Sequence, residues 1–192
     1  MTIWCANVEY VQEFDRLNNL AKDLEKQVDI VDNVKSWTLD FEKYADSYLD
    51  LPNNADSLSQ LSEDDFHQKL TQFLFSPRGG QYRQKFKFTE NQTLTCGETA
   101  PRMILSEISF VHKLFTGPEE HVPAMNRIKA LIENANLSGR VFPLSQGYAS
   151  WETDEVCTYL RIIPGLYVIA LLIIIHNLCI MYRLLLLNST GI

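Results

Sequence analysis

The stretch IIPGLYVIALLIIIHNLCIMY, from Ile162 to Tyr182, decides how the chain is organised. Its 21 residues include no Asp, Glu, Lys or Arg. As a helix rising about 1.5 Å per residue it would be about 31 Å long, close to the ~30 Å hydrocarbon core of a bilayer. A buried helix of a soluble protein is usually shorter and carries a polar stripe. We therefore expect one C-terminal transmembrane helix, and Arg161 and Arg183 at its two ends leave its orientation open.

Two polar side chains, His176 and Asn177, interrupt this expected span. An unsatisfied polar group is costly inside a membrane, so both side chains require partners. They are either a polar patch or proton path facing another helix, or plain helix–helix hydrogen bonds, which is the interpretation we favour. Both interpretations call for partner helices from outside this sequence.

The charged residues are distributed very unevenly along the 192 residues. All 24 acidic residues and 15 of the 17 basic residues lie within residues 1–155. A net-acidic block without a basic stripe repels phosphate, which argues against a nucleic-acid partner. We expect a folded acidic domain over residues 1–155, a helix that enters and crosses the membrane over residues 156–187, and a short tail over residues 188–192.

Hydrophobic periodicity within the acidic block predicts an α+β fold. Ser36 and Ser62 are expected N-caps of two helices in the middle of the block. The stretch 103–114 fits a helix or a strand equally well, and the helix carrying Met125 and Ile128 begins between Pro118 and Pro123. The other expected elements are strands at 3–10, 30–35, 85–88 and 141–143, helices at 11–27 and 148–161, and a hairpin partner for 85–88 at 93–96. This order is compatible with a split ferredoxin-like sandwich that carries a helical insertion.

No arrangement of residues typical of catalysis or metal binding occurs in the sequence. The four histidines are scattered, and no HExxH, GxSxG or CxxC pattern is present. Gly79-Gly80 lacks the Lys-Ser/Thr pair of a phosphate-binding loop and is interpreted as a turn. The aromatic stripe of Trp37, Phe41, Tyr44 and Tyr48 has helical spacing, which favours ordinary core over a lipid cavity. We expect no enzyme, no cofactor and no metal site.

Glycosylation sequons and cysteines bear weakly on the compartment of the block. Asn91 and Asn136 begin sequons within it, and Asn188 begins a third in the tail, which slightly favours a lumenal location. Cys5, Cys96 and Cys157 precede the span without metal-ligand spacing. Whether these cysteines pair with one another stays open.

Four short motifs follow one another along the block. They are Ser36-Trp37-Thr38-Leu39-Asp40-Phe41; Phe73-Leu74 followed by Pro77, Gly80 and Tyr82; Ala124-Met125 with Arg127; and Val141-Phe142-Pro143-Leu144 followed by Tyr148 and Trp151-Glu152. Together they resemble, in the same order, motifs of lumenal domains in the Patched and Niemann–Pick type C transporter family. The resemblance covers nearly the whole chain and ends just before the expected span. Thr153-Asp154-Glu155 departs from the family, which often has Gln and an aromatic residue there.

The resemblance implies the second extracytosolic domain of such a transporter, together with the first helix of its second membrane bundle. In this family two related ferredoxin-like ectodomains form a conduit for sterol or other lipid, driven by an ion gradient. The chain would then be a membrane protein of the plasma membrane or endosomal system, with residues 1–155 extracellular or lumenal. Its partners would be lipid, a sister ectodomain and further helices, and it would not transport alone.

A second hypothesis follows from the residues alone. No signal peptide is visible in the first 15 residues, and few residues follow the expected span. These features are typical of a tail-anchored adaptor whose acidic block binds partners in the cytosol.

Overall fold

The computed structural model describes residues 1–48, 58–89, 93–160 and 173. By its contacts the chain divides into two compact units, residues 1–148 and the segment from residue 149 onward. The first unit is a mixed α+β domain with one five-stranded antiparallel sheet. In the described part of the second unit, residues 149–160 continue a helix that starts at residue 146.

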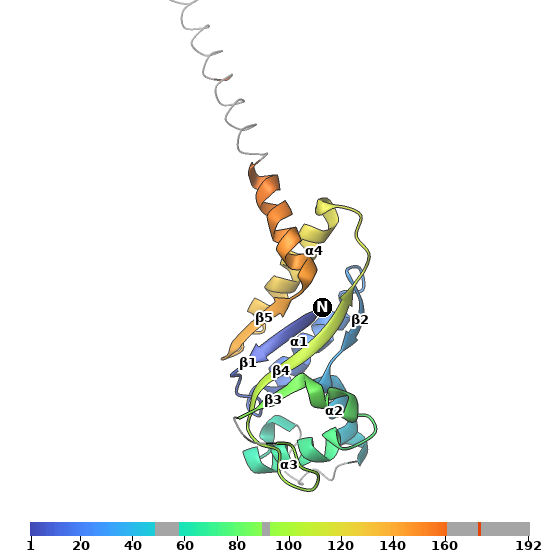
Figure 1. Ribbon diagram of the computed structural model, residues 1–192, viewed down its shortest axis with the longest axis vertical. Coiled ribbons are helices and arrows are strands. Elements are labelled where there is room, and N and C mark those ends of the chain that lie inside the picture. Colours follow the sequence, from blue (N-terminus) through green and yellow to red (C-terminus); the bar gives the residue numbers. More distant parts are fainter. Residues whose placement is uncertain (49–57, 90–92, 161–172, 174–192) are drawn as a thin grey trace, which may run out of the picture. The chain divides into compact units, whose positions relative to one another are not determined.

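The ten-residue strand β4, Met103–His112, organises the sheet (Figure 1). One of its edges pairs with β1, Thr2–Ala6, which in turn pairs with β5, Arg140–Leu144. The other edge pairs with β2, Val31–Lys35, near the end of β4, and with the short β3, Phe86–Phe88, near its start. The main strand order is therefore β2-β4-β1-β5, and every pair is antiparallel.

Alternation along the strands gives the sheet a buried face and an outer face. Ile3, Cys5 and Ile108 are fully buried, in one core with apolar side chains of α1, Phe14–Glu25, and α4, Pro118–Asn134. In Figure 1, α1 lies behind the sheet. The side chains between these positions point the other way, and Phe142 and Val111 are about half exposed. The helices therefore leave the outer face accessible.

A helical insertion separates β2 from β3. It contains α2, Trp37–Tyr48, the 3-10 turn η1, Leu58–Gln60, the helix α3, Glu63–Leu74, and a second 3-10 turn η2, Gly80–Lys85. Both helices have a serine N-cap, as predicted. The Thr38 N–H donates to Ser36 Oγ at 3.3 Å, and the Asp65 N–H donates to Ser62 Oγ at 3.2 Å.

An aromatic cluster attaches the insertion to the rest of the domain. Phe14 of α1 contacts the rings of Trp37, Phe41 and Phe66 with centroids 5.8–5.9 Å apart. Phe41 also contacts Phe73 at 5.2 Å, and all five side chains are at most 1% exposed. Each such pair stabilises by about 0.5–1.5 kcal/mol beyond its burial. The predicted stripe is thus core at Trp37 and Phe41, whereas Tyr48 is 74% exposed.

Several predicted elements need correction. The first strand ends at Ala6 and not at Tyr10, because Asn7 has a left-handed φ of 53°. The hairpin prediction for 93–96 is wrong, since β3 pairs with β4 and no strand is assigned to 93–96. The stretch 103–114 is a strand over Met103–His112 and not a helix, because its alternate side chains enter the core beside β1. The helix α4 begins at Pro118 and keeps Pro123 in its interior.

The helix predicted for 148–161 is confirmed over residues 148–160. Apart from residue 173, the uncharged stretch 162–182, with His176 and Asn177, lies outside the described residues, as do Asn91 and Asn188. Among the described residues, no helix has the length and apolar character required to cross a bilayer.

Replacing Phe41 tests the importance of the aromatic cluster. Phe41→Ala leaves a cavity among four rings and should lower the free energy of unfolding by about 3–5 kcal/mol. Tyr48→Ala, on the exposed end of the same helix, should change it by less than about 0.5 kcal/mol. Urea unfolding followed by tryptophan fluorescence measures both values, and equal losses would contradict the assignment of the cluster.

Candidate functional site

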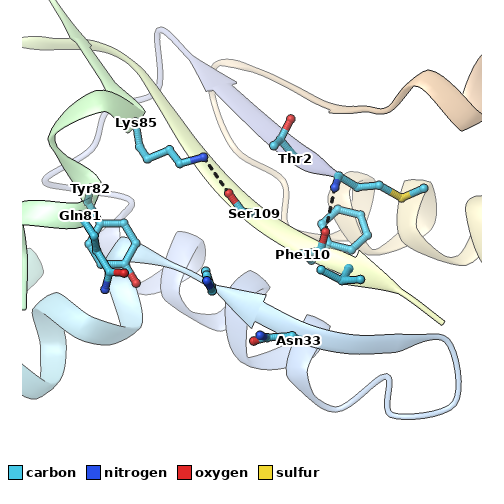
Figure 2. Close-up of a pocket in the computed structure, with 10 residues that line it drawn as sticks. Thr2, Asn33, Gln81, Tyr82, Lys85, Ser109 and Phe110 are labelled. Atoms are coloured by element: carbon cyan, nitrogen blue, oxygen red, sulfur yellow. Dashed lines mark hydrogen bonds between the residues drawn. The ribbon is translucent and has the colours of Figure 1, made fainter.

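A pocket of about 450 Å³ opens on the outer face of the sheet, beside η2 (Figure 2). We call it the η2 pocket. Strands β1, β2 and β4 form its floor, and η2 forms one wall. Its lining residues are Met1, Thr2, Asn33, Lys35, Gln81, Tyr82, Lys85, Ser109, Phe110 and Val111.

The strand register explains how the floor is built. Ser109 of β4 lies opposite Thr2 on one side and opposite Lys35 on the other. Residues directly opposite one another in a sheet share a face, so these three polar side chains form a row. Ile108 and Phe110, the neighbours of Ser109, point into the core and are at most 1% exposed. The pocket floor is therefore the polar outer face of a well-packed sheet.

The lining of the pocket is positively charged. Lys35 and Lys85 are its charged side chains, and none of the ten lining residues carries a carboxylate. Lys85 Nζ forms an ion pair with Glu107 and donates to Ser109 Oγ at 3.0 Å. The Ser109 hydroxyl donates in turn to Glu107 Oε1 at 2.8 Å. This network holds the Lys85 ammonium group above the floor.

The wall of the pocket is connected to α2 by one hydrogen bond. The Tyr82 hydroxyl donates to Asp40 Oδ2 at 2.7 Å, across 42 residues of sequence. Burial, reinforced by the Asp40 carboxylate, raises the pKa of Tyr82, which therefore stays protonated as a donor. Tyr82 also stacks on Phe73 of α3, with ring centroids 6.0 Å apart. Asp40 and Tyr82, which come from two of the predicted motifs, are thus in direct contact, and Tyr82 lines the pocket.

The turn before η2 requires a glycine at position 79. A Cβ at Gly79 would lie 2.0 Å from the Phe73 carbonyl oxygen, so any side chain there would displace the end of α3. A Cβ at Gly80, which we identified as the motif glycine, meets nothing within 4 Å. The close approach is therefore made by Gly79, the neighbour of the residue identified from the sequence.

The remaining motif residues lie elsewhere. Phe142 is on the outer face of β5 opposite Trp4, with ring centroids 6.5 Å apart, and Pro143 lies opposite Ile3 on the same edge strand. Trp151 and Glu152 belong to the second unit, which begins at residue 149. The motif residues therefore do not converge on one centre.

Tyr148 closes a chain of hydrogen bonds at the end of the first unit. His112 Nδ1 lies 2.9 Å from the Ile30 carbonyl oxygen, and Nε2 lies 2.9 Å from the Tyr148 hydroxyl. A carbonyl only accepts, so Nδ1 carries the proton and Nε2 of the neutral ring accepts from Tyr148. Burial lowers the pKa of His112, which favours this neutral form.

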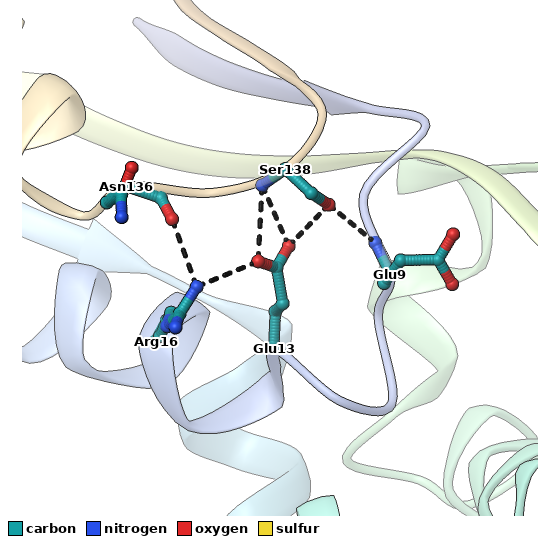
Figure 3. A network of polar contacts seen from close by, with 5 residues as sticks. All are labelled: Glu9, Glu13, Arg16, Asn136 and Ser138. Carbon is teal, nitrogen blue, oxygen red and sulfur yellow. Dashed lines mark hydrogen bonds and ion pairs between the residues drawn. The ribbon is translucent and has the colours of Figure 1, made fainter.

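The Asn136 sequon lies in an exposed turn between α4 and β5 (Figure 3). Asn136 has a left-handed φ of 46°, and its carbonyl accepts from Arg16 Nη1 at 3.1 Å. Ser138, the third sequon residue, donates from N and Oγ to the Glu13 carboxylate at 2.8–3.2 Å. The Asn136 side chain is exposed. The Ser138 hydroxyl, by contrast, donates to the carboxylate of Glu13, a residue that is only 7% exposed.

The three described cysteines are free thiols. Cys5 is buried on β1, and burial raises the pKa of its thiol to about 12, so it is inert. Cys96 and Cys157 are exposed. Within the described part of the chain, no group of three or more His, Cys, Asp or Glu side chains could hold a metal ion.

The sequence did not reveal the η2 pocket. Its polar residues come from three strands and a turn, and each alone is an ordinary exposed side chain. The alternation Lys85-Phe86-Lys87-Phe88 was the one available signal, because it placed Lys85 and Lys87 on the outer face.

Comparison of the chain with models of protein families, with curated proteins and with solved structures found no match in any of the three.

The Asp40–Tyr82 hydrogen bond should contribute measurably to stability. Tyr82→Phe removes the donor to a partly buried carboxylate and should lower the free energy of unfolding by about 1.5–3 kcal/mol. Tyr44→Phe, in a ring that also contacts Phe73, is the matched control and should cost less than about 0.5 kcal/mol. Urea unfolding measures both, and a neutral Tyr82→Phe would show that the bond does not hold η2 in place.

The lowered pKa of His112 predicts a pH dependence of stability. The unfolded chain takes up a proton near the ordinary pKa of about 6.5, before the folded protein does. Folding is therefore favoured above this pH, and the free energy of unfolding falls as the pH drops from about 7 to 5. His112→Gln should make this decline shallower. Unfolding curves across the range test it, and an unchanged slope in the variant would contradict the assignment.

Proposed function

We propose that the chain is an extracytosolic domain of a Patched or Niemann–Pick type C type transporter or receptor, which handles sterol or other lipid. Residues 1–155 would form this domain, and residues 156–187 would lead into and cross the membrane. The role would be non-catalytic, and transport would need helices and a sister ectodomain from outside this sequence.

The strand order supports a ferredoxin-like assignment. The order β2-β4-β1-β5, with α1 following β1 and α4 following β4, matches two interlocked β-α-β units. The helical insertion falls between these units, where the resemblance expects it. An antiparallel sheet with helices on one face suits a domain that meets a neighbour through its other face.

The Asp40–Tyr82 hydrogen bond is the observation that carries the proposal. Two motifs recognised separately in the sequence supply one partner each, at 2.7 Å. The first motif also supplies Trp37 and Phe41 to the aromatic cluster. If the two motifs resembled the family only by chance, their residues would not be expected to contact each other.

Enzymatic deglycosylation tests the proposed placement of residues 1–155. In the full chain expressed in eukaryotic membranes, glycosidase treatment should lower the apparent mass. Asn91→Gln and Asn136→Gln together should abolish this shift, because they remove both sequons of the domain. Asn134→Gln, an exposed asparagine outside any sequon, should retain it.

Protease treatment of intact microsomes distinguishes a lumenal from a cytosolic location of residues 1–155. The proposal predicts that residues 1–155 are protected. Digestion of this block, together with no mass shift, would contradict the proposal and favour the tail-anchored cytosolic adaptor with an acidic partner-binding domain.

A further inference from the structure

We propose that the η2 pocket is a binding site for a phosphate-bearing organic ligand. The site itself stands independently of the proposed function. Only the identification of the ligand as a lipid headgroup rests on it.

Hydrogen-bond donors converge on the pocket from three elements. Lys35 and Asn33 come from β2 and Thr2 from β1, while the Ser109 hydroxyl of β4 already donates to Glu107. Gln81 and Lys85 come from η2, which forms a wall of the pocket (Figure 2). A phosphate group presents several oxygens in different directions, and it is therefore matched by ammonium, hydroxyl and amide donors arranged around it.

The charge of the pocket contrasts with that of the domain. Residues 1–155 carry 24 acidic and 15 basic residues, yet no carboxylate lines this pocket. Lys35 is exposed and has no ion-pair partner among the described residues. A cationic pocket on an acidic surface attracts a small anion locally, while the domain as a whole repels polyanions.

Lys85 is held ready for an incoming anion. An ammonium group has three N–H donors, and two of them are directed to Glu107 and Ser109. The third remains for a ligand. Glu107 partly neutralises Lys85, so it positions the ammonium group at some cost in affinity for an anion.

Size and polarity narrow the class of ligand. A volume of about 450 Å³ exceeds that of a bare oxyanion and lies within the range of small-molecule pockets. Val111, which is 54% exposed, contributes apolar surface for an organic body attached to the phosphate. The rigid apolar body of a sterol would cover the Lys35 ammonium group without giving it a hydrogen-bond partner, which is costly.

Calorimetric titration of the full chain in neutral detergent tests the site with three probes. These are inorganic phosphate, water-soluble dihexanoyl phosphatidic acid and, as the zwitterionic control, dihexanoyl phosphatidylcholine. At least one of the two anionic probes should bind saturably, and added salt should weaken the binding. Tighter binding of phosphatidic acid would identify a lipid headgroup as the source, and equal binding would identify a free phosphate compound.

Substitutions in and near the η2 pocket test whether the anionic probes bind there. Lys35→Gln and Lys85→Gln should each weaken it about tenfold, because each removes one charge-assisted contact. Glu107→Gln should tighten it several-fold by releasing Lys85. Lys87→Gln, which removes an exposed lysine near the pocket but outside its lining, should leave it unchanged.

Lys35→Gln is the decisive variant. The Lys35 side chain is exposed, so this variant should remain folded even if Lys85→Gln does not. The proposal is overturned if neither anionic probe binds, or if binding is insensitive to Lys35→Gln. A cytosolic location of residues 1–155 would contradict the proposed function but would leave these titrations unaffected.

Discussion

Burial of five aromatic rings is the interaction on which the rest of the domain depends. Phe14 of α1 supplies one ring, and the insertion supplies Trp37, Phe41, Phe66 and Phe73. The cluster places α2 and α3 against α1, which packs on the sheet. The position of Phe73 then determines where Tyr82 stacks and where η2 forms the wall of the pocket. Without this cluster, the η2 pocket would have a floor but no wall.

Elements decided by local patterns could be predicted from the sequence. The serine N-caps, the spacing of Phe66, Leu70 and Phe73, and the alternation at 85–88 all gave correct elements. Elements decided by partners far along the chain could not. The stretch 103–112 fits two periodicities, and only its pairing with β1, β2 and β3 makes it a strand. The pairing of 85–88 with 93–96 failed for the same reason.

The same difference between local patterns and partners far along the chain applies to the residues of the candidate site. Trp37, Asp40 and Tyr82 were recognised from the sequence because they fall in short ordered motifs, and Asp40 and Tyr82 meet in space. Lys35, Ser109 and Thr2 were not, because they share a row only through the register of three strands. Gly79 was missed in favour of Gly80, since a close backbone approach to Phe73 has no signature in composition.

Hydrogen exchange of the full chain most directly tests the claim that the insertion and the sheet share one core. Amides of α2 and α3 should exchange with an opening free energy similar to that of β1 and β4, because all four elements bury side chains in the same cluster of contacts. Rapid exchange of α2 and α3, while β1 and β4 stay protected, would contradict this account. The insertion would then open separately, and the wall of the η2 pocket would be lost with it.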